Sequence, residues 1–169
     1  PLLRDREIGW LRRISTTPIS PAKLLAAQAV INIILAAVGF TILIAGSTLI
    51  FSVKLAFDIP GFILSLVLAT LTMFSLGLLI TSVAPSQSTG NGITMGLLYP
   101  LLFFAGVYVP IETLPSGLQT AALFTPVGAA VKAINSSMTG SFPSFVPLIV
   151  MAAYAVVFSF VAIRYFRWE

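Results

Sequence analysis

The 169-residue sequence contains no cysteine and no histidine. Without cysteine the chain has no disulfide, no reactive thiolate and no cysteine metal site. Without histidine it lacks the commonest general base and the commonest protein ligand of transition metals. These two absences exclude the most frequent kinds of catalytic and metal centre.

Charge is scarce as well. Only 8% of the residues are charged and 58% are hydrophobic, whereas about a quarter of the residues are charged in an ordinary soluble domain. The apolar residues also occur in long runs rather than scattered through the chain. We therefore expect an all-α integral membrane protein that contacts the lipid bilayer.

The motifs of nucleotide and hydrolytic chemistry are missing too. Each of the three lysines follows an alanine or a valine, so no GxxxxGK[ST] phosphate-binding loop occurs. No paired carboxylates, GxSxG elbow or HExxH helix is present. We expect no catalytic residue, no metal and no cofactor in this chain, and no enzymatic activity of its own.

Four apolar runs approach or exceed the length of about 20 residues that a helix needs to cross a bilayer. We predict four transmembrane helices, over residues 24–51, 61–83, 93–109 and 145–163. Residues 84–92 read as a turn-rich linker without charge. The third run is short and contains Pro100, so we expect a kink or a broken helix there.

Residues 110–143 are less uniformly apolar, and prolines interrupt them. The pattern predicts two short helices, at 116–124 and 127–138. Thr125 would cap the second, with Pro126 at its first helical position and a glycine just past its end. Because neither helix can cross, we expect both to lie in the outer interface or to dip back into the membrane.

The charged residues concentrate near the start, where residues 4–20 hold six of the fourteen. At helical spacing Ile8, Leu11 and Ile14 share one side, which predicts an amphipathic helix within residues 1–20. Pro18 would end this helix. Such a helix can rest on anionic headgroups or insert into a groove of another protein, and the pattern leaves both open.

Orientation follows from the positive charges. With a cytoplasmic N-terminus, the inner side holds seven Lys and Arg residues and the outer side two, so we expect both ends to be cytoplasmic. The net charge of +4 then reflects orientation rather than a nucleic-acid partner. The first residue is Pro1 rather than Met, which suggests a piece of a longer protein.

Uncharged polar residues occur in the first predicted span. Gln28, Asn32 and Thr41 could line a path for a partly polar substrate, or hydrogen-bond to neighbouring helices. None of the four spans contains Asp, Glu, Lys, Arg or His, which argues against a proton relay or ion-coupled transport. Gly92 and Gly96 have the GxxxG spacing that is typical of closely packed membrane helices.

Three stretches carry a family resemblance. They are residues 6–20 (REIGWLRRISTTPIS), 98–115 (LYPLLFFAGVYVPIETLP) and 124–131 (FTPVGAAV). In these runs the sequence resembles the membrane subunit, or permease, of ATP-binding-cassette exporters of type 2. Thr125 replaces the more usual asparagine of the third run. The likeness covers essentially the whole chain and matches the part of such a permease that follows its second span.

The resemblance implies a mechanism. The permease would pair with a second copy or a sister subunit in a plasma or inner membrane, and two separate subunits that bind ATP and Mg would dock on its cytoplasmic side. The stretch that matches the family's coupling helix would sit in a cleft of the ATPase. Its residues here are Glu7, Trp10, Leu11, Arg12, Arg13, Ile14, Thr17 and Pro18.

On the outer side, the resemblance implies two re-entrant helices that close the exit. The residues that would break helices around this outer gate are Pro100, Gly106, Pro110, Pro115 and Pro126. Family precedent favours export of a small-molecule, lipid-linked or polysaccharide substrate, although import stays open. The alternative is an energy-independent channel or scaffold protein, since no residue of the chain couples to an energy source. A secondary transporter is a third reading, which the uncharged spans oppose.

Overall fold

The structure is a computed structural model that describes residues 21–52 and 56–165. In this part of the chain the only extended pairing is an isolated bridge between Ala56 and Thr139. All other regular structure there is helical, which confirms the predicted all-α class. The elements are α3 (Pro21–Phe51), α4 (Ile59–Val83), α5 (Gln87–Phe104), the 3-10 turn η1 (Ile111–Thr113), α6 (Ser116–Leu123), α7 (Pro126–Met138) and α8 (Phe145–Tyr165).

Three helices are long and apolar enough to span a membrane. They cover Leu25–Ile50 in α3, Ile59–Val83 in α4 and Phe145–Tyr165 in α8. Helix α5 is not among them: with 18 residues it is long enough, but the polar residues of its first turns make it too little hydrophobic. The structure therefore supports three of the four predicted spans, and the fourth stays a prediction.

Helix α5 differs from the sequence prediction at its start. Residues 84–92 were expected to form a linker, but the helix begins at Gln87. Ser86 is its N-cap, and its hydroxyl accepts a hydrogen bond of 3.2 Å from the Thr89 N–H. A serine cap satisfies one of the unpaired N–H groups of the first turn, so a polar sequence can begin a helix. The linker prediction was wrong for this reason.

The end of α5 also differs from the prediction. The helix runs through Pro100 without interruption and ends at Phe104, short of the expected residue 109. The chain turns at Gly106, whose φ of +78° lies in the left-handed region that glycine adopts readily. The break in the backbone therefore falls at Gly106 rather than at Pro100.

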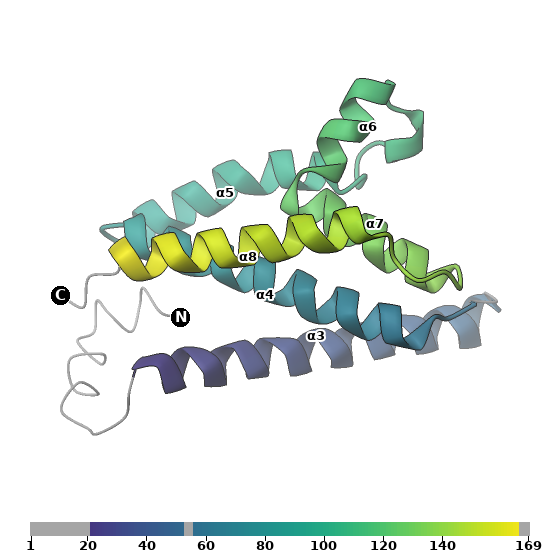
Figure 1. Cartoon of the computed structure of the whole chain (residues 1–169), viewed down its shortest axis with the longest axis horizontal. Helices are drawn as coiled ribbons and strands as arrows, with labels where there is room; N and C mark the ends of the chain where they lie inside the picture. The colour runs from purple at the N-terminus through teal and green to yellow at the C-terminus, as the bar shows by residue number, and fades with distance from the viewer. Residues whose placement is uncertain (1–20, 53–55, 166–169) are drawn as a thin grey trace.

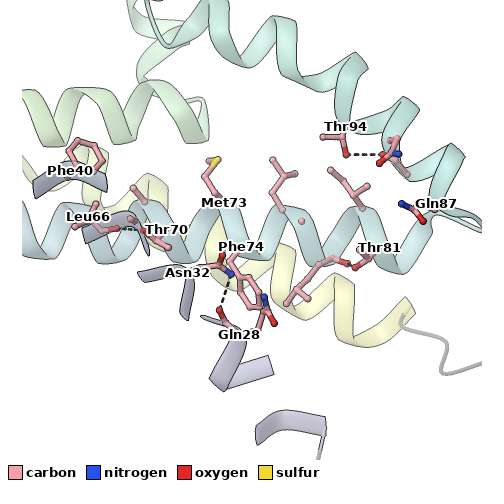
Figure 2. A pocket seen from close by; sticks show the side chains of 18 of the residues that line it. Gln28, Asn32, Phe40, Leu66, Thr70, Met73, Phe74, Thr81, Gln87 and Thr94 are labelled. Carbon is pink, nitrogen blue, oxygen red and sulfur yellow. Dashed lines mark hydrogen bonds between the residues drawn. The ribbon is translucent and has the colours of Figure 1, made fainter. Parts of the chain in front are cut away.

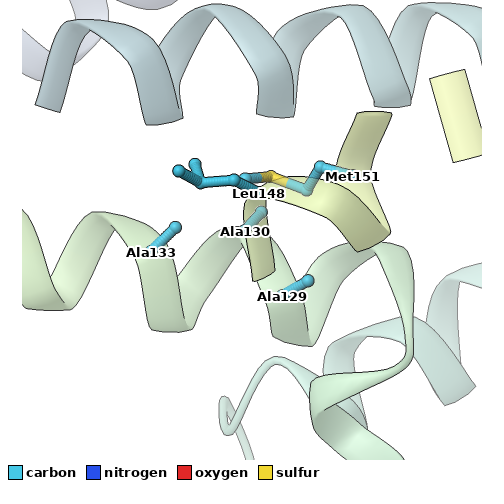
Figure 3. Packing of buried hydrophobic residues seen from close by; sticks show 5 residues of the cluster. All are labelled: Ala129, Ala130, Ala133, Leu148 and Met151. Atoms are coloured by element: carbon cyan, nitrogen blue, oxygen red, sulfur yellow. The ribbon is translucent and has the colours of Figure 1, made fainter. Parts of the chain in front are cut away.

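The core lies where α4, α7 and α8 meet. Helix α4 packs most extensively against α8, and also contacts α7 and α3 (Figure 1). The centre of the core consists of small side chains of α7 against two larger ones of α8 (Figure 3), namely Ala129, Ala130, Ala133, Leu148 and Met151. Alanines let the short helix approach its neighbours closely, as small residues do in membrane proteins.

Helix α4 buries hydroxyl side chains but no charged ones, beside the apolar Leu68 and Ala69 that pack on this core. Its buried residues include Ser65, Thr72, Ser75 and Ser82. The Thr72 hydroxyl donates to the Leu68 carbonyl oxygen of its own helix at 2.7 Å and also lies 2.9 Å from the Met151 carbonyl oxygen of α8. This second contact joins α4 and α8, the two helices that pack most extensively against each other.

Thr72→Val should therefore weaken the α4–α8 contact. We expect a loss of about 0.6 kcal/mol, and at most about 1.7 kcal/mol, the range of hydrogen bonds between membrane helices. Thr70→Val is the control, because the Thr70 hydroxyl donates only to Leu66 of its own helix. Unfolding of the purified protein in detergent measures both. Equal losses for the two variants would contradict a stabilising contact between the helices.

The predicted short helices are present. The Thr125 hydroxyl accepts from the Gly128 N–H at 3.1 Å, Pro126 is the first residue of α7, and Gly140 follows its end with φ +82°. The Asp58 N–H donates to the Ser137 carbonyl oxygen at 2.9 Å, which ties the start of α4 to the end of α7. Helix α7 is thus packed into the bundle against α4 and α8.

Candidate functional site

A cleft lies between α3 and α5, with α4 as its floor. Its volume is about 690 Å³, within the range of roughly 300–1,000 Å³ that is usual for ligand sites. Helix α3 contributes four lining residues at intervals of four, which places them along one stripe of the helix. They are Gln28, Asn32, Ala36 and Phe40.

The floor and second wall come from α4 and α5. Figure 2 shows Leu66, Thr70, Met73 and Thr81 in sequence along α4, with Phe40 near one end of this row. The first turns of α5 line the opposite end of the cleft, through Gln87, Gly90, Asn91 and Thr94. Ile134 of α7 completes the lining.

Polar side chains are concentrated at the end near the α4–α5 turn. Of the seven polar lining residues, Thr70 alone lies in the half that also contains Phe40 and Leu66. Of the other six, Gln28 and Asn32 lie near the middle of the row, close to Met73 and Phe74, and the α4–α5 turn end has Thr81, Gln87, Asn91 and Thr94 (Figure 2). The cleft is therefore amphipathic along its length.

The hydroxyl protons in the lining are already used. Those of Thr70, Thr81 and Thr94 donate to the carbonyl oxygens of Leu66, Leu78 and Gly90 on their own helices, at 2.8 Å each. The Asn32 amide likewise donates to the Gln28 carbonyl oxygen at 2.9 Å. A hydroxyl whose proton is engaged still offers lone pairs as an acceptor. The polar end is thus rich in acceptors.

No residue that lines the cleft is ionisable. Lys23, Asp58, Glu112, Lys132 and Arg164 are all outside the lining. Across residues 21–52 and 56–165, no group of three or more acidic side chains could hold a metal ion. The lining of the cleft therefore offers hydrogen bonds and apolar contacts to a ligand, but no acid, base or ion-binding group.

Two of the three predicted path residues, Gln28 and Asn32, line the cleft. Thr41 does not: its side chain is exposed, and its hydroxyl donates to the Ala37 carbonyl oxygen at 2.7 Å. Thr41 follows Phe40 directly, and one residue turns a helix by about 100°, which moves it off the stripe. Whether a substrate passes these side chains stays a prediction.

Several lining residues were not predicted. Gln87, Asn91 and Thr94 were missed because the first turns of α5 were taken for a linker, and Thr70 and Thr81 because hydroxyl residues are common in membrane helices. The Ser86 cap three residues before Thr89 was the signal that could have identified the helix start.

The residues expected to break helices near the outer gate occupy distinct places. Pro110 and Pro115 immediately precede η1 and α6, and Pro126 begins α7. Gly106 follows α5, and Pro100 lies inside it. A gating role for the five stays a prediction. All eight predicted coupling residues, from Glu7 to Pro18, lie outside the described part of the chain.

The first residue of α3 and the last of α8 lie at one end of the bundle (Figure 1). The α4–α5 turn is at this end too, while the α3–α4 connector and the loop that precedes α8 are at the other. The polar end of the cleft thus faces the end of the bundle from which residues 1–20 continue.

Comparisons with family models and with known proteins point to the same family. Residues 2–139 match the family described as ABC-2 type transporter. The chain is 25% identical over 124 residues to a probable multidrug ABC transporter permease, YbhR, of Escherichia coli K12, covering 73% of this chain and 34% of that protein.

Two further relatives are a nodulation protein and a transport permease. Nodulation protein J of Rhizobium leguminosarum bv. trifolii is 34% identical over 73 residues, which is 43% of this chain and 28% of that protein. The inner membrane transport permease YhhJ of E. coli K12 is 23% identical over 129 residues, 74% of this chain and 34% of its own. The chain thus spans about a third of the length of these relatives. No solved structure matches it significantly.

Proposed function

The chain belongs to the ABC-2 type transporter family, and from this premise we propose that it is the permease of an ATP-binding-cassette exporter. It is a multi-pass membrane component of a transporter, and it carries no nucleotide-binding loop. In the proposed complex, separate ATPase subunits bind ATP and Mg and supply the energy. The permease forms the path through the membrane with a second copy or a sister subunit.

One observation supports external energy most strongly. The cleft lining is uncharged, and the four predicted spans contain no Asp, Glu, Lys, Arg or His. Ion-coupled transport in membranes normally relies on such groups. The charged residues are instead concentrated in residues 4–20, inside the region that matches the family. We assign to this stretch the contact with the ATPase.

In the proposed mechanism, residues 7–18 act as a coupling helix in a groove of the ATPase. When two ATPases close on ATP, they move this helix as a lever. The movement shifts the membrane part between conformations open to the inside and to the outside. Trp10, Leu11 and Ile14 would form the apolar contact edge, with Arg12 and Arg13 beside them. Both ends of the chain would be cytoplasmic.

The outer segment closes the exit in this proposal. Helices α6 and α7 follow three prolines and are too short to cross a membrane, so they suit a re-entrant arrangement. The Tyr154 hydroxyl of α8 donates to the Phe124 carbonyl oxygen at 3.0 Å, at the turn between the two short helices. This contact links the proposed outer gate to a spanning helix.

Inactivating the ATPase distinguishes this function from a channel or scaffold. The permease is co-expressed with the proposed partner ATPase, in wild-type form and with the P-loop lysine of the ATPase replaced by alanine. We expect efflux of a panel of fluorescent drugs and labelled amphiphiles from cells to fall to the level of cells without permease. Efflux that continues undiminished would favour an energy-independent channel. Cells with the wild-type pair are the control.

A further inference from the structure

We propose that the α3–α4–α5 cleft binds elongated, uncharged amphiphiles, with the hydrogen-bonding head near Gln28 and Thr81 and the apolar tail toward Phe40 and Leu66. The inference rests on the proposed transport function and assigns a substrate class to this site. Four observations about the lining carry it: its charge, its shape, its polarity gradient and the direction of its hydrogen bonds.

The first observation is that the lining carries no charge and so disfavours charged ligands. All nineteen lining residues are neutral, and the apolar ones predominate. A charged ligand here would leave water without gaining a counter-ion, which costs far more than moving a neutral polar group. The lining therefore favours neutral ligands over both cations and anions of the same size.

The shape favours an elongated ligand. Along α4 the lining extends from Leu66 to Thr81, which at the helical rise corresponds to about 22 Å. This distance is a large part of the roughly 30 Å hydrocarbon thickness of a bilayer. A compact polar molecule would leave the apolar half of the cleft unfilled, whereas an alkyl-chain amphiphile can occupy both halves.

The polarity gradient sets the orientation of the ligand. Phe40 and Leu66 give one end its apolar lining, and amide and hydroxyl side chains line the other (Figure 2). An entirely apolar occupant would leave polar groups such as the Gln28 and Asn91 amides without a ligand partner, at a cost of about 1–3 kcal/mol each. A ligand head that forms hydrogen bonds avoids this cost.

The hydrogen bonds of the lining specify the head group. The Thr81 and Thr94 hydroxyls donate to their own helices, so they can only accept from a ligand. The Asn32 amide uses one of its two N–H donors on the Gln28 carbonyl oxygen, so its own carbonyl oxygen stays available as an acceptor and its second N–H as a donor. Ligand heads with several O–H or N–H donors, such as sugars, polyols or amides, match this set.

Gly77 offers a direct test, because a Cβ at this position would meet no atom within 4 Å. Gly77→Phe places a bulky side chain in the cleft from a position where the first added carbon meets nothing. Gly39→Phe is the matched control: Gly39 also has open space around it and lies on α3 outside the lining. Both variants are made in the full permease in nanodiscs, and gel filtration checks their folding.

Binding is measured without ATP, using three radiolabelled decyl compounds with different heads: neutral decyl glucoside, cationic decyl trimethylammonium and anionic decyl sulfate. We expect the glucoside to bind at least tenfold more tightly than either charged compound. Gly77→Phe should weaken its binding at least tenfold, and Gly39→Phe should leave it unchanged. Equal binding of the three compounds, or unchanged glucoside binding in Gly77→Phe, would overturn the proposal.

A labelling measurement tests whether a protein helix, rather than a ligand, occupies the cleft. The chain contains no cysteine, so Gly77→Cys introduces one thiol into it. We expect this thiol to react with a maleimide and decyl glucoside to protect it. A thiol that stays unreactive would show that protein covers the cleft, and would overturn the proposal. Because neither measurement uses ATP, a failed ATPase assignment would leave these results intact, so the two failures are distinguishable.

Discussion

Reversing the charge of Arg12 and Arg13 to glutamate is expected to abolish substrate-stimulated ATPase activity while the permease still inserts and folds. The two arginines lie in the proposed coupling stretch, beside the apolar edge of Trp10, Leu11 and Ile14. Unfavourable charges in a protein interface cost several kcal/mol. Since each 1.4 kcal/mol is a factor of ten, we expect stimulation to fall by at least about tenfold.

The control must separate docking from net charge. Arg164→Glu with Arg167→Glu makes the same change in charge on the predicted cytoplasmic side, but at the other end of the chain. This pair should retain stimulation. The conservative pair Arg12→Lys with Arg13→Lys should retain most of it, because both charges remain. Full stimulation in the reversed Arg12 and Arg13 variant would contradict docking through residues 7–18.

Replacing Gly128 by alanine is expected to destabilise the outer segment strongly. An added Cβ would overlap the Ala122 carbonyl group and would lie 2.9 Å from the Thr125 hydroxyl oxygen. The first obstacle is backbone, which cannot rotate away as a flexible side chain can. Overpacking of this kind typically costs about 1–3 kcal/mol. The α6–α7 turn and the Thr125 cap of α7 should both be distorted.

Gly117→Ala is the matched control for this prediction. Gly117 lies in α6, and a Cβ there would meet nothing within 4 Å. Alanine at this site should be neutral or slightly stabilising, because it favours the helix more than glycine does. Thermal unfolding of the purified permease in detergent measures both variants. A midpoint for Gly128→Ala equal to that of the wild type would contradict the close approach at this turn.

Local signals in the sequence predicted helices well where caps and breakers agree. Thr125, Pro126 and Gly140 defined α7 within one residue, because cap chemistry depends on neighbours in sequence. The same logic failed at α5, where Gly90 and Gly92 were read as turn residues although Ser86 caps a helix there. Glycine marks both turns and closely packed helices in membranes, so composition could not separate the two.

Tertiary features were less accessible from sequence. The stripe from Gln28 to Phe40 is readable from spacing, but its partner surfaces on α4 and α5 depend on how three helices pack. Likewise, the alanines of α7 indicate close packing without naming α4 and α8 as the neighbours. The outer helices were correctly expected to be too short to cross, yet their packing into the bundle required the structure.

The central claim is that this permease is energised by a separate ATPase. Affinity purification of the tagged full permease from its native membrane, followed by mass spectrometry, tests it most directly. We expect a P-loop ATPase to co-purify in an amount equal to the permease, and to be lost in the Arg12→Glu, Arg13→Glu variant. Recovery of the folded permease with no P-loop ATPase would contradict the account.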